Sequence, residues 1–487
     1  MTLRPQRAVG LLTALFLAVA CGRPPTPSTT AATPIRPATT PTSAAAPPSP
    51  TVQVQLPVDW PLSSSGPWLV YLTDAGLMVA NPDGSGRTPL FPGDHLGQAY
   101  LYDFGRLASP TGGWLAVYTY EDRDRQSGPT LQLVHVPDGL VPWSTPLLSN
   151  DLEAAFAGGT DAEAMTAYEA VTLAGAAAWA PDGRSLAFVA ALDGTSSDLY
   201  LYDLATSRVR RVTSGPNQIA TPFWSPDGKW IAHQAVEGFG SGAGWQMGSV
   251  WTVSPDGRDL NKLYAPESGG EVFVGWSRGD SLISYSFSPD GLHNIRAAGA
   301  DGAVENILVP STFSDVAYDP ESGSVAYAVS GDLEFTGSET GAFLWNPVGG
   351  TDRIDPGSWD AVHWSPAAGR FYFEGEAGVL GVTPAGDSLQ LPVVDRVSPS
   401  PDGRYVVLWG DGFWNRQSGM QLYTSDMQFV RTLDEFDVPV VSWRPDSAGL
   451  MAMSEAGLTY YPLDGQPLVV DPSATASFEG GLGWVMP

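Results

Sequence analysis

The sequence predicts an all-β fold, a single β-propeller of four-stranded blades. Three observations favour it: a turn-rich and aromatic-rich composition with 55 Gly, 43 Pro and 17 Trp in 487 residues, a recurring strand–turn motif, and a spacing of roughly 35 to 50 residues between copies of that motif. The chain carries 24 Lys and Arg against 52 Asp and Glu, a formal net charge of −28. Because such a charge repels phosphate backbones, no nucleic-acid partner is expected.

Residues 1–20 have the pattern of an export signal. Arg4 and Arg7 precede an apolar run from Ala8 to Val19, which at about 12 residues is too short to span a bilayer. Cys21 is the only cysteine, and its setting resembles the lipobox of bacterial lipoproteins, in which this thiol carries the lipid. We therefore expect an extracytoplasmic protein, lipid-anchored through Cys21 to the bacterial cell membrane or outer membrane. An ordinary secretory signal is the alternative.

Residues 21–58 are rich in Pro, Thr, Ser and Ala, and no acidic residue occurs before Asp59. Such a segment cannot bury a core, so it predicts a disordered tether, with the propeller over residues 59–487. The tether and signal hold four arginines, which leaves the propeller with 20 basic residues against 52 acidic ones, a balance of −32. The propeller is thus the acidic part of the chain, and its charge favours a cationic or divalent-cation-linked partner.

The repeat unit is an apolar strand ending in an aromatic residue, a tight Pro-Asp-Gly turn and three further short strands. Pro, Asp and Gly in succession suit a type I turn followed by a left-handed residue, so the aspartates are expected to be turn residues rather than ligands. The count gives about nine units, with seven or eight as alternatives if a weak copy is not a blade. The clearest copies are 178–183, 223–228 and 398–403, and weaker ones begin at Ala108, Trp276, Tyr318, Trp364 and Trp443.

These motifs resemble the WD40-like PD40 repeats of TolB-type propellers, a family related to the propeller of prolyl-oligopeptidase-like enzymes. The resemblance covers about residues 66–487 and implies the propeller fold. We expect no counterpart of the amino-terminal α/β domain of TolB or of the hydrolase domain of the peptidases. The resemblance therefore implies neither family's activity.

The two ends of the propeller are predicted to share one blade. Residues 481–487 resemble a first strand with nothing after it, whereas 67–72 resemble a second strand with no first strand before it. Joining them would pair two unprotected strand edges and hold the ring closed.

Up-and-down strands place the connections of a blade on two faces. First-to-second and third-to-fourth turns are short and alike, and lie on what we call the turn face. Second-to-third and inter-blade connections lie on the loop face, which holds the irregular segments. Its longest insertion, near 149–172, has capping-box spacing at Asn150 with Glu153 and at Thr160 with Glu163, which predicts two short helices.

Aromatic and acidic side chains gather in these loops. They suit a cationic or amphipathic peptide, or a sugar face stacked on an indole; the alternative is that the aromatic rings pack within their own loops. The candidate binding residues are Tyr120, Glu121, Asp122, Asp124, Phe239, Trp245, Glu334, Phe335, Asp411, Phe413 and Trp414.

Catalytic and metal-binding signals are weak. One Gly-x-Ser-x-Gly segment, 275–279, matches the nucleophile elbow of α/β-hydrolases, but Ser277 aligns with the turn residue Ser225 of the repeat. The five histidines lack paired ligand spacing. We therefore predict no catalytic residue, no metal site and no cofactor. A set of tryptophans at one repeat position is predicted to pack blade against blade: Trp179, Trp224, Trp276, Trp364, Trp443 and Trp484.

The leading functional hypothesis is a noncatalytic, membrane-anchored propeller that binds a protein, peptide or cell-wall glycan outside the cytoplasm through its loop face. One alternative is a glycan hydrolase or lyase that uses carboxylates near the propeller channel. Another is a structural part of an envelope assembly.

Overall fold

The computed structural model describes residues 61–487 with gaps, so the predicted signal, Cys21 and the tether lie outside the described residues. The gaps are at 74, 93–106, 121–127, 158–160, 173–175, 216, 239–244, 266–269, 278–280, 289–290, 300–302, 308–311, 332, 334–336, 392–395, 411–418, 436–439, 455 and 475–480.

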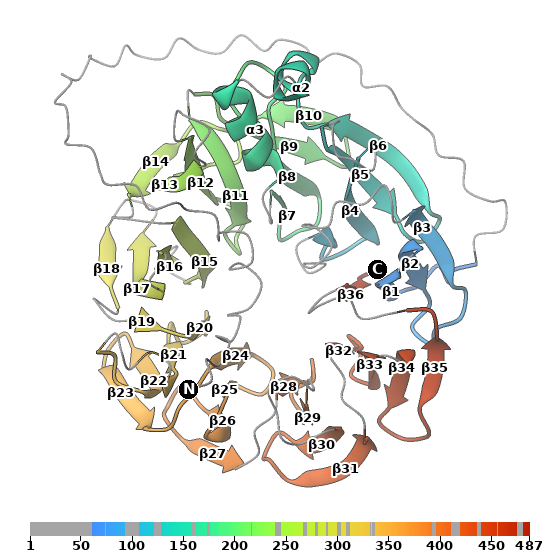
Figure 1. Ribbon diagram of the computed structural model, residues 1–487, viewed down its shortest axis with the longest axis vertical. Coiled ribbons are helices and arrows are strands. Elements are labelled where there is room, and N and C mark those ends of the chain that lie inside the picture. Colours follow the sequence, from blue (N-terminus) through green and yellow to red (C-terminus); the bar gives the residue numbers. More distant parts are fainter. Residues whose placement is uncertain are drawn as a thin grey trace, which may run out of the picture. The chain divides into compact units, whose positions relative to one another are not determined.

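The described residues form nine antiparallel sheets, which stand as blades around a ring (Figure 1). This confirms the all-β propeller and the count of nine units. We number the blades along the chain. Blade 1 contains β36 (Leu482–Val485), β1 (Trp68–Thr73), β2 (Gly76–Ala80) and β3 (Thr88–Pro92). Blade 2 contains β4 (Trp114–Thr119), β5 (Thr130–His135) and β6 (Leu140–Pro146). Blade 3 contains β7 (Ala177–Trp179), β8 (Ser185–Ala190), β9 (Asp198–Asp203) and β10 (Arg208–Arg211).

The middle blades follow the same order from the innermost to the outermost strand. Blade 4 contains β11 (Gln218–Trp224), β12 (Ile231–Gly238), β13 (Trp245–Val253) and β14 (Leu260–Tyr264). Blade 5 contains β15 (Gly270–Trp276), β16 (Ser281–Ser288), β17 (Gly291–Gly299) and β18 (Val304–Asn306), and β19 (Thr312–Phe313) also pairs with β17. Blade 6 contains β20 (Asp315–Tyr318), β21 (Val325–Val329), β22 (Gly341–Asn346) and β23 (Gly350–Asp355).

The last three blades complete the ring. Blade 7 contains β24 (Ala361–Ser365), β25 (Arg370–Gly375), β26 (Gly378–Val382) and β27 (Ser388–Leu391). Blade 8 contains β28 (Arg396–Pro399), β29 (Tyr405–Trp409), β30 (Met420–Thr424) and β31 (Phe429–Asp434). Blade 9 contains β32 (Val440–Trp443), β33 (Gly449–Ser454), β34 (Gly457–Pro462) and β35 (Leu468–Asp471).

Blade 1 combines strands from both ends of the described chain. β36 pairs antiparallel with β1, with Trp68 opposite Val485 and Leu69 opposite Trp484. The backbone N–H of Gly113, in blade 2, donates to the Met486 carbonyl at 2.7 Å, so the last strand also contacts the next blade. That this pairing holds the ring closed remains a prediction, which is tested below.

Tryptophans at the repeat position connect successive blades. The indole N–H of Trp224 donates to the Ala178 carbonyl at 3.1 Å, and that of Trp443 donates to the Ser398 carbonyl at 3.1 Å. Each acceptor immediately precedes the equivalent position of the preceding blade. Trp179 follows the same rule toward Leu107 at 2.9 Å. These contacts confirm the predicted blade-to-blade packing for the three tryptophans. A smaller side chain could not reach the carbonyl group of the preceding blade.

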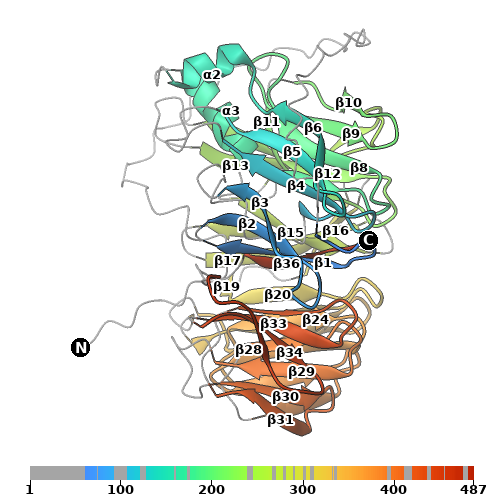
Figure 2. The same cartoon turned by 90° about the vertical axis from the view of Figure 1, so that its right-hand side faces the viewer.

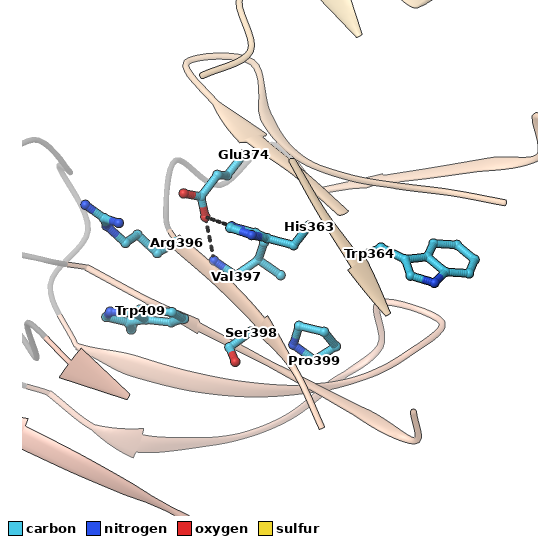
Figure 3. A pocket seen from close by; sticks show the side chains of 8 residues that line it. All are labelled: His363, Trp364, Glu374, Arg396, Val397, Ser398, Pro399 and Trp409. Atoms are coloured by element: carbon cyan, nitrogen blue, oxygen red, sulfur yellow. Dashed lines mark hydrogen bonds and ion pairs between the residues drawn. The ribbon is translucent and has the colours of Figure 1, made fainter. Parts of the chain in front are cut away.

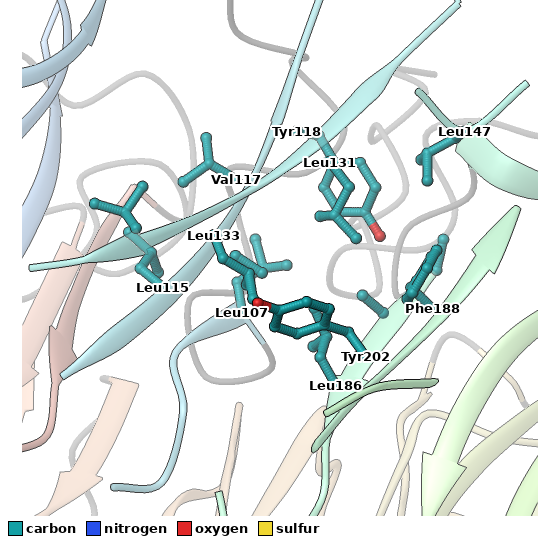
Figure 4. Close-up of a cluster of buried hydrophobic side chains, with 14 of the residues drawn as sticks. Leu107, Leu115, Val117, Tyr118, Leu131, Leu133, Leu147, Leu186, Phe188 and Tyr202 are labelled. Carbon is teal, nitrogen blue, oxygen red and sulfur yellow. The ribbon is translucent and has the colours of Figure 1, made fainter. Parts of the chain in front are cut away.

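The largest apolar cluster of the described residues runs from blade 1 through blade 2 to blade 3 and the two helices, and Figure 4 shows its part at blades 2 and 3. Trp143 lies 4.4 Å from the Tyr202 ring and 5.6 Å from that of Phe188, measured between ring centroids. Strands of both sheets contribute fully buried side chains, such as Leu115 and Leu186. Burial of each large apolar side chain is worth about 1.5–3 kcal/mol, so the faces between blades account for most of the apolar stabilisation.

The insertion after blade 2 forms two helices, α2 (Asn150–Ala157) and α3 (Ala162–Thr172), as predicted. Figure 2 shows them on the side of the ring opposite the carboxyl terminus, which is the loop face. The caps differ from the expected ones. Ser149 Oγ accepts from Leu152 N at 3.4 Å, and Asp161 Oδ1 accepts from Ala164 N at 3.2 Å. The residue that caps each helix is thus one position away from the predicted cap, because both neighbours are polar and only local geometry selects between them.

The Pro-Asp-Gly turns on the turn face share one hydrogen-bond pattern. Asp227 Oδ1 accepts from Ser225 Oγ at 2.8 Å and from Lys229 N at 3.0 Å, while Gly228 is left-handed with φ 71°. Equivalent bonds are made by Asp256 and Asp402. Partial burial acts to raise the pKa of Asp227, but hydrogen bonding from Lys229 and Ser225 outweighs this effect and lowers that pKa to about 2. These aspartates are turn residues, as the sequence predicted.

Removal of residues 480–487 tests the role of the composite blade. This truncation exposes the inner edge of β1 and loses the buried Val485 and the half-buried Trp484, so we expect the melting temperature to fall by roughly 5 °C or more. Deletion of residues 30–40 in the tether is the control and should leave the melting temperature unchanged. Equal melting temperatures for both variants and wild type would rule out closure by this strand.

Replacement of a turn aspartate tests its structural role. Asp227→Ala should lower the free energy of unfolding by about 1 kcal/mol near neutral pH, because the hydrogen bonds of one partly exposed turn are lost. The difference from wild type should disappear as the pH falls toward 2, since a carboxyl with a lowered folded-state pKa loses its contribution on protonation. Urea unfolding between pH 2.5 and 7 measures both effects. A pH-independent difference would contradict this role of the carboxylate.

Candidate functional site

Most of the predicted binding residues fall in the gaps. Trp245 begins β13, where its backbone pairs with Gly238. Tyr120 follows β4, is 5% exposed and packs in the core between blades 2 and 3. This corrects its assignment, because a ring buried in the core stabilises the blade and does not face a ligand. The candidates outside the described residues are Glu121, Asp122, Asp124, Phe239, Glu334, Phe335, Asp411, Phe413 and Trp414.

A hollow of about 310 Å³ lies between blades 7 and 8. Figure 3 shows His363 beside Glu374, whose carboxylate reaches Val397 on the facing strand, while the ring of Trp364 points away from them. Trp364 and Trp409 also line the hollow, but their rings pack into apolar clusters on the other faces of their blades. The remaining lining residues of the hollow are Arg396, Ser398 and Pro399. Strands β24 and β28, which supply His363 and Arg396, are the innermost strands of their blades, and Glu374 comes from the adjacent strand β25, so the hollow lies beside the central channel.

The hollow lies at the base of a predicted binding loop. Trp409 is the last residue of β29, and Gly410 N donates to Gly419 O at 3.1 Å. The segment between them, 411–418, carries the candidates Asp411, Phe413 and Trp414. These candidates lie outside the described residues and remain a prediction, and the sequence could not identify the hollow, whose lining comes from four strands of two blades.

Glu374 organises the polar side of the hollow. One of its carboxylate oxygens, Oε2, accepts from Val397 N at 2.8 Å and lies 3.9 Å from His363 Nε2. The Glu374 side chain is 12% exposed and that of His363 is 47% exposed. A single carboxylate thus holds the inner strand of blade 8 against blade 7 and presents a charge to an accessible imidazole.

The charge of His363 depends on its carboxylate neighbours. Partial desolvation favours the neutral imidazole, but hydrogen bonding to Glu374 and the charges of Glu374 and Asp315 outweigh it and raise the pKa of His363 above its ordinary value. Asp315 accepts from Val362 N at 2.9 Å, and burial raises its own pKa. With Arg396 beside it, the hollow combines cationic groups and a carboxylate within an acidic protein.

A second ionic cluster joins blades 4 and 5 but is buried. Glu271 is 2% exposed and accepts from Tyr264 OH and Ser284 Oγ, both at 2.9 Å, and its Oε1 lies 3.4 Å from Arg296. Burial raises the pKa of Glu271 to about 7, while the charge of Arg296 opposes the shift. Sequence reasoning missed this cluster, although a lone acid and a lone arginine in apolar strands were its signal. Its burial makes it a structural contact rather than a ligand site.

The Gly-x-Ser-x-Gly segment has the environment of a repeat turn. Ser277 N donates to Ser281 O at 2.8 Å, and Ser277 Oγ accepts from Ser281 N at 3.0 Å, between β15 and β16. A strand follows it where a nucleophile elbow has a helix. In the described part of the chain, no group of three or more His, Cys, Asp or Glu side chains is placed to hold a metal ion. Neither described helix has the length and hydropathy needed to span a membrane.

Comparisons with known proteins match parts of the chain. No family model matches it. It is 40% identical over 53 residues to an uncharacterized peptidase, YuxL, of Bacillus subtilis, covering 11% of this chain and 8% of the peptidase. It is 39% identical over 54 residues to the Tol-Pal system protein TolB of Alcanivorax borkumensis, covering 11% of this chain and 12% of TolB. An uncharacterized Agrobacterium fabrum protein is 30% identical over 113 residues, which cover 23% of this chain and 36% of that protein.

Among solved structures, a eukaryotic initiation factor superposes with a TM-score of 0.52 at 12% identity, covering 82% of this chain and 95% of that one. This similarity supports the propeller fold. The chain matches well under half the length of each of these curated relatives, and their matches are local. These local matches agree with a TolB-like propeller repeat. The activities of the whole relatives are not transferred to this chain.

Two substitutions at Glu374 test the geometry of the hollow. Glu374→Ala leaves the buried N–H of Val397 without this acceptor and should cost about 1–3 kcal/mol, whereas Glu374→Gln keeps an oxygen acceptor and should cost less. Glu374→Gln should also lower the pKa of His363, followed by NMR titration. Because that pKa is raised in the folded state, the pair stabilises the fold at low pH and this contribution is lost as the pH rises through the raised value. An unchanged His363 titration in Glu374→Gln would contradict the pairing.

Proposed function

We propose that the protein is a noncatalytic binding scaffold, tethered outside the cytoplasm by a lipid on Cys21, that holds a protein, peptide or cell-envelope component on its loop face. The contrast between the two faces carries this proposal. Turns on the turn face repeat one hydrogen-bonded geometry, as at Asp227 and Asp402. The loop face bears the α2–α3 insertion and connections of different lengths on a rigid ring, which is the usual arrangement of a binding surface.

The hollow between blades 7 and 8 supports the same face. It brings His363, Glu374 and Arg396 together at the edges of Trp364 and Trp409, whose rings pack into the neighbouring apolar clusters. Charged groups of both signs in one hollow recognise peptides and sugars through hydrogen bonds and ion pairs. The candidates Asp411, Phe413 and Trp414 follow Trp409 of the hollow directly in the sequence, so we propose that they belong to the same binding region.

The location of the scaffold follows from the sequence of the first 58 residues. The export signal and Cys21 supply the anchor, and the tether supplies reach from the membrane. The local match to a Tol-Pal system protein agrees with a role in the cell envelope. The strongly acidic propeller favours a partner with a cationic surface.

Affinity capture from envelope extracts tests the binding face. The Trp245→Ala/Trp414→Ala variant should reduce the captured partner at least tenfold relative to wild type. The control, Val348→Ala/Arg258→Ala, alters exposed residues of the turn face and should capture as wild type does. Capture that is lost in the control but kept in the loop-face variant would contradict the proposal. Release of reducing ends from a polysaccharide by the purified protein, lost in Glu374→Gln, would instead favour the glycan-active alternative.

A further inference from the structure

The hollow between blades 7 and 8 lies where the repeat departs from its own pattern. The repeat position that holds Trp224 and Trp443 is the last residue of the innermost strand, and a tight turn follows it. In blade 8 the last residue of β28 is Pro399, and the turn begins with Ser400 N donating to Tyr405 O at 2.9 Å. Pro399 therefore stands at the position where blades 4 and 9 have an indole.

Blade 8 keeps the acceptor half of the tryptophan contact. Trp443 of blade 9 donates to the carbonyl of Ser398, the residue before Pro399. Trp224 donates in the same way to the carbonyl of Ala178 in blade 3. The inner strand of blade 8 thus has the ordinary position in the ring, and only the side chain that it directs toward blade 7 differs.

Two other blades lack a tryptophan at this position, but there the substituted residue is buried. Ala108 in blade 2 is 9% exposed and belongs to the apolar cluster that contains Trp68. Tyr318 in blade 6 is 6% exposed and belongs to the cluster that joins blades 5 and 6. Pro399 instead is half-buried and lines the hollow of about 310 Å³. Because an apolar cavity of about 150 Å³ takes up benzene, this hollow has room for an indole ring.

The walls of the hollow suit a flat ring that carries an N–H group. On blade 8 they are formed by the buried Val397 and by Pro399, and on blade 7 by His363, whose side chain is 47% exposed. An imidazole can stack on the face of an indole, and a protonated one adds a cation–π attraction. The repeat rule places the acceptor at the His363 carbonyl, because this residue precedes the tryptophan position of blade 7 as Ala178 does in blade 3.

We propose that the hollow binds a tryptophan side chain of the partner, with its ring between Pro399 and His363 and its N–H donated to the His363 carbonyl. The chain itself holds indoles in this way, because Trp224 and Trp443 fill the equivalent places at two other interfaces. This assignment rests on the proposed function, since it names the chemistry by which the partner is held.

Ligand-observed NMR of the full-length protein tests the hollow, with N-acetyl-tryptophanamide as the probe. Saturation should transfer to this probe and not to N-acetyl-leucinamide, and the tryptophan probe should shift the imidazole resonances of His363. Pro399→Trp should abolish the transfer, because its own indole takes the place of the probe. The matched control, Val348→Trp, adds an indole at a fully exposed position of the turn face and should bind the probe as wild type does.

Thermal unfolding of a second variant keeps the test valid if Pro399→Trp is poorly folded. His363 occupies part of the interface that Ala178 leaves open for Trp224. His363→Ala/Pro399→Trp restores a small residue opposite the indole, so its melting temperature should exceed that of Pro399→Trp. The double variant should also fail to bind the probe.

Three outcomes would overturn the proposal. One is equal binding of the tryptophan probe to wild type and to the double variant. Another is equal binding of the tryptophan and leucine probes. The third is probe binding that appears only in Trp414→Ala, which would assign the hollow to a ring of this chain's own loop.

Affinity capture separates this proposal from the proposed function. A partner that wild type and His363→Ala/Pro399→Trp capture equally would contradict the role of the hollow and leave the binding scaffold in place. Probe binding by a wild-type protein that captures no envelope component would instead contradict the scaffold and leave the indole site in place.

Discussion

Each blade can bury its two apolar faces only against its neighbours, and this constraint shapes the whole protein. A four-stranded sheet alone leaves one face or the other in water, so the blades are stable only as a ring. The tryptophans of the inner strands show how the requirement is met at close range. Trp224 and Trp443 each fill the space toward the preceding blade and donate their indole N–H to its backbone. Packing and hydrogen bonding thus fix the same distance between sheets.

In a ring made this way, the elements that stabilise the fold are separate from the loop face that we propose as the binding surface. The blade faces and the turn-face hydrogen bonds hold the scaffold, so the loop face is free to vary. The α3 helix illustrates the link between the two, because its buried side Ala170 packs with Ala220 and Val236 of blade 4 while the helix itself lies on the loop face. The hollow between blades 7 and 8 has a similar dual character. Glu374 holds the blades together through Val397 and also sets the charge of the accessible His363.

Much of the fold could be predicted from the sequence because its signals are local. The aspartate of each Pro-Asp-Gly turn bonds to groups two residues away, and a tryptophan recurs at one position because neighbouring blades need it. The composite blade could be predicted because two incomplete repeats complement each other. The helix caps were misplaced by one residue, since adjacent polar residues compete for the same N–H groups.

The site could be predicted only in part, for a physical reason. Tyr120 has the sequence environment of a loop aromatic, but its ring lies in the core between blades 2 and 3. No local sequence pattern indicates that the core has room for this ring. The hollow and the Glu271–Arg296 cluster each bring together residues of different strands, so their spacing in the chain carries no motif. The packing of strands that are far apart in the sequence, and not the composition, decides which polar residues come into contact.

We propose that the loop face binds the partner and that the turn face does not. Site-specific photo-crosslinking in intact cells tests it most directly, with the crosslinker at Glu376 on the exposed β25–β26 connection of the loop face or at the fully exposed Val348 on the turn face. We expect a crosslinked partner adduct from position 376 and none from position 348. An adduct from position 348 alone would contradict it.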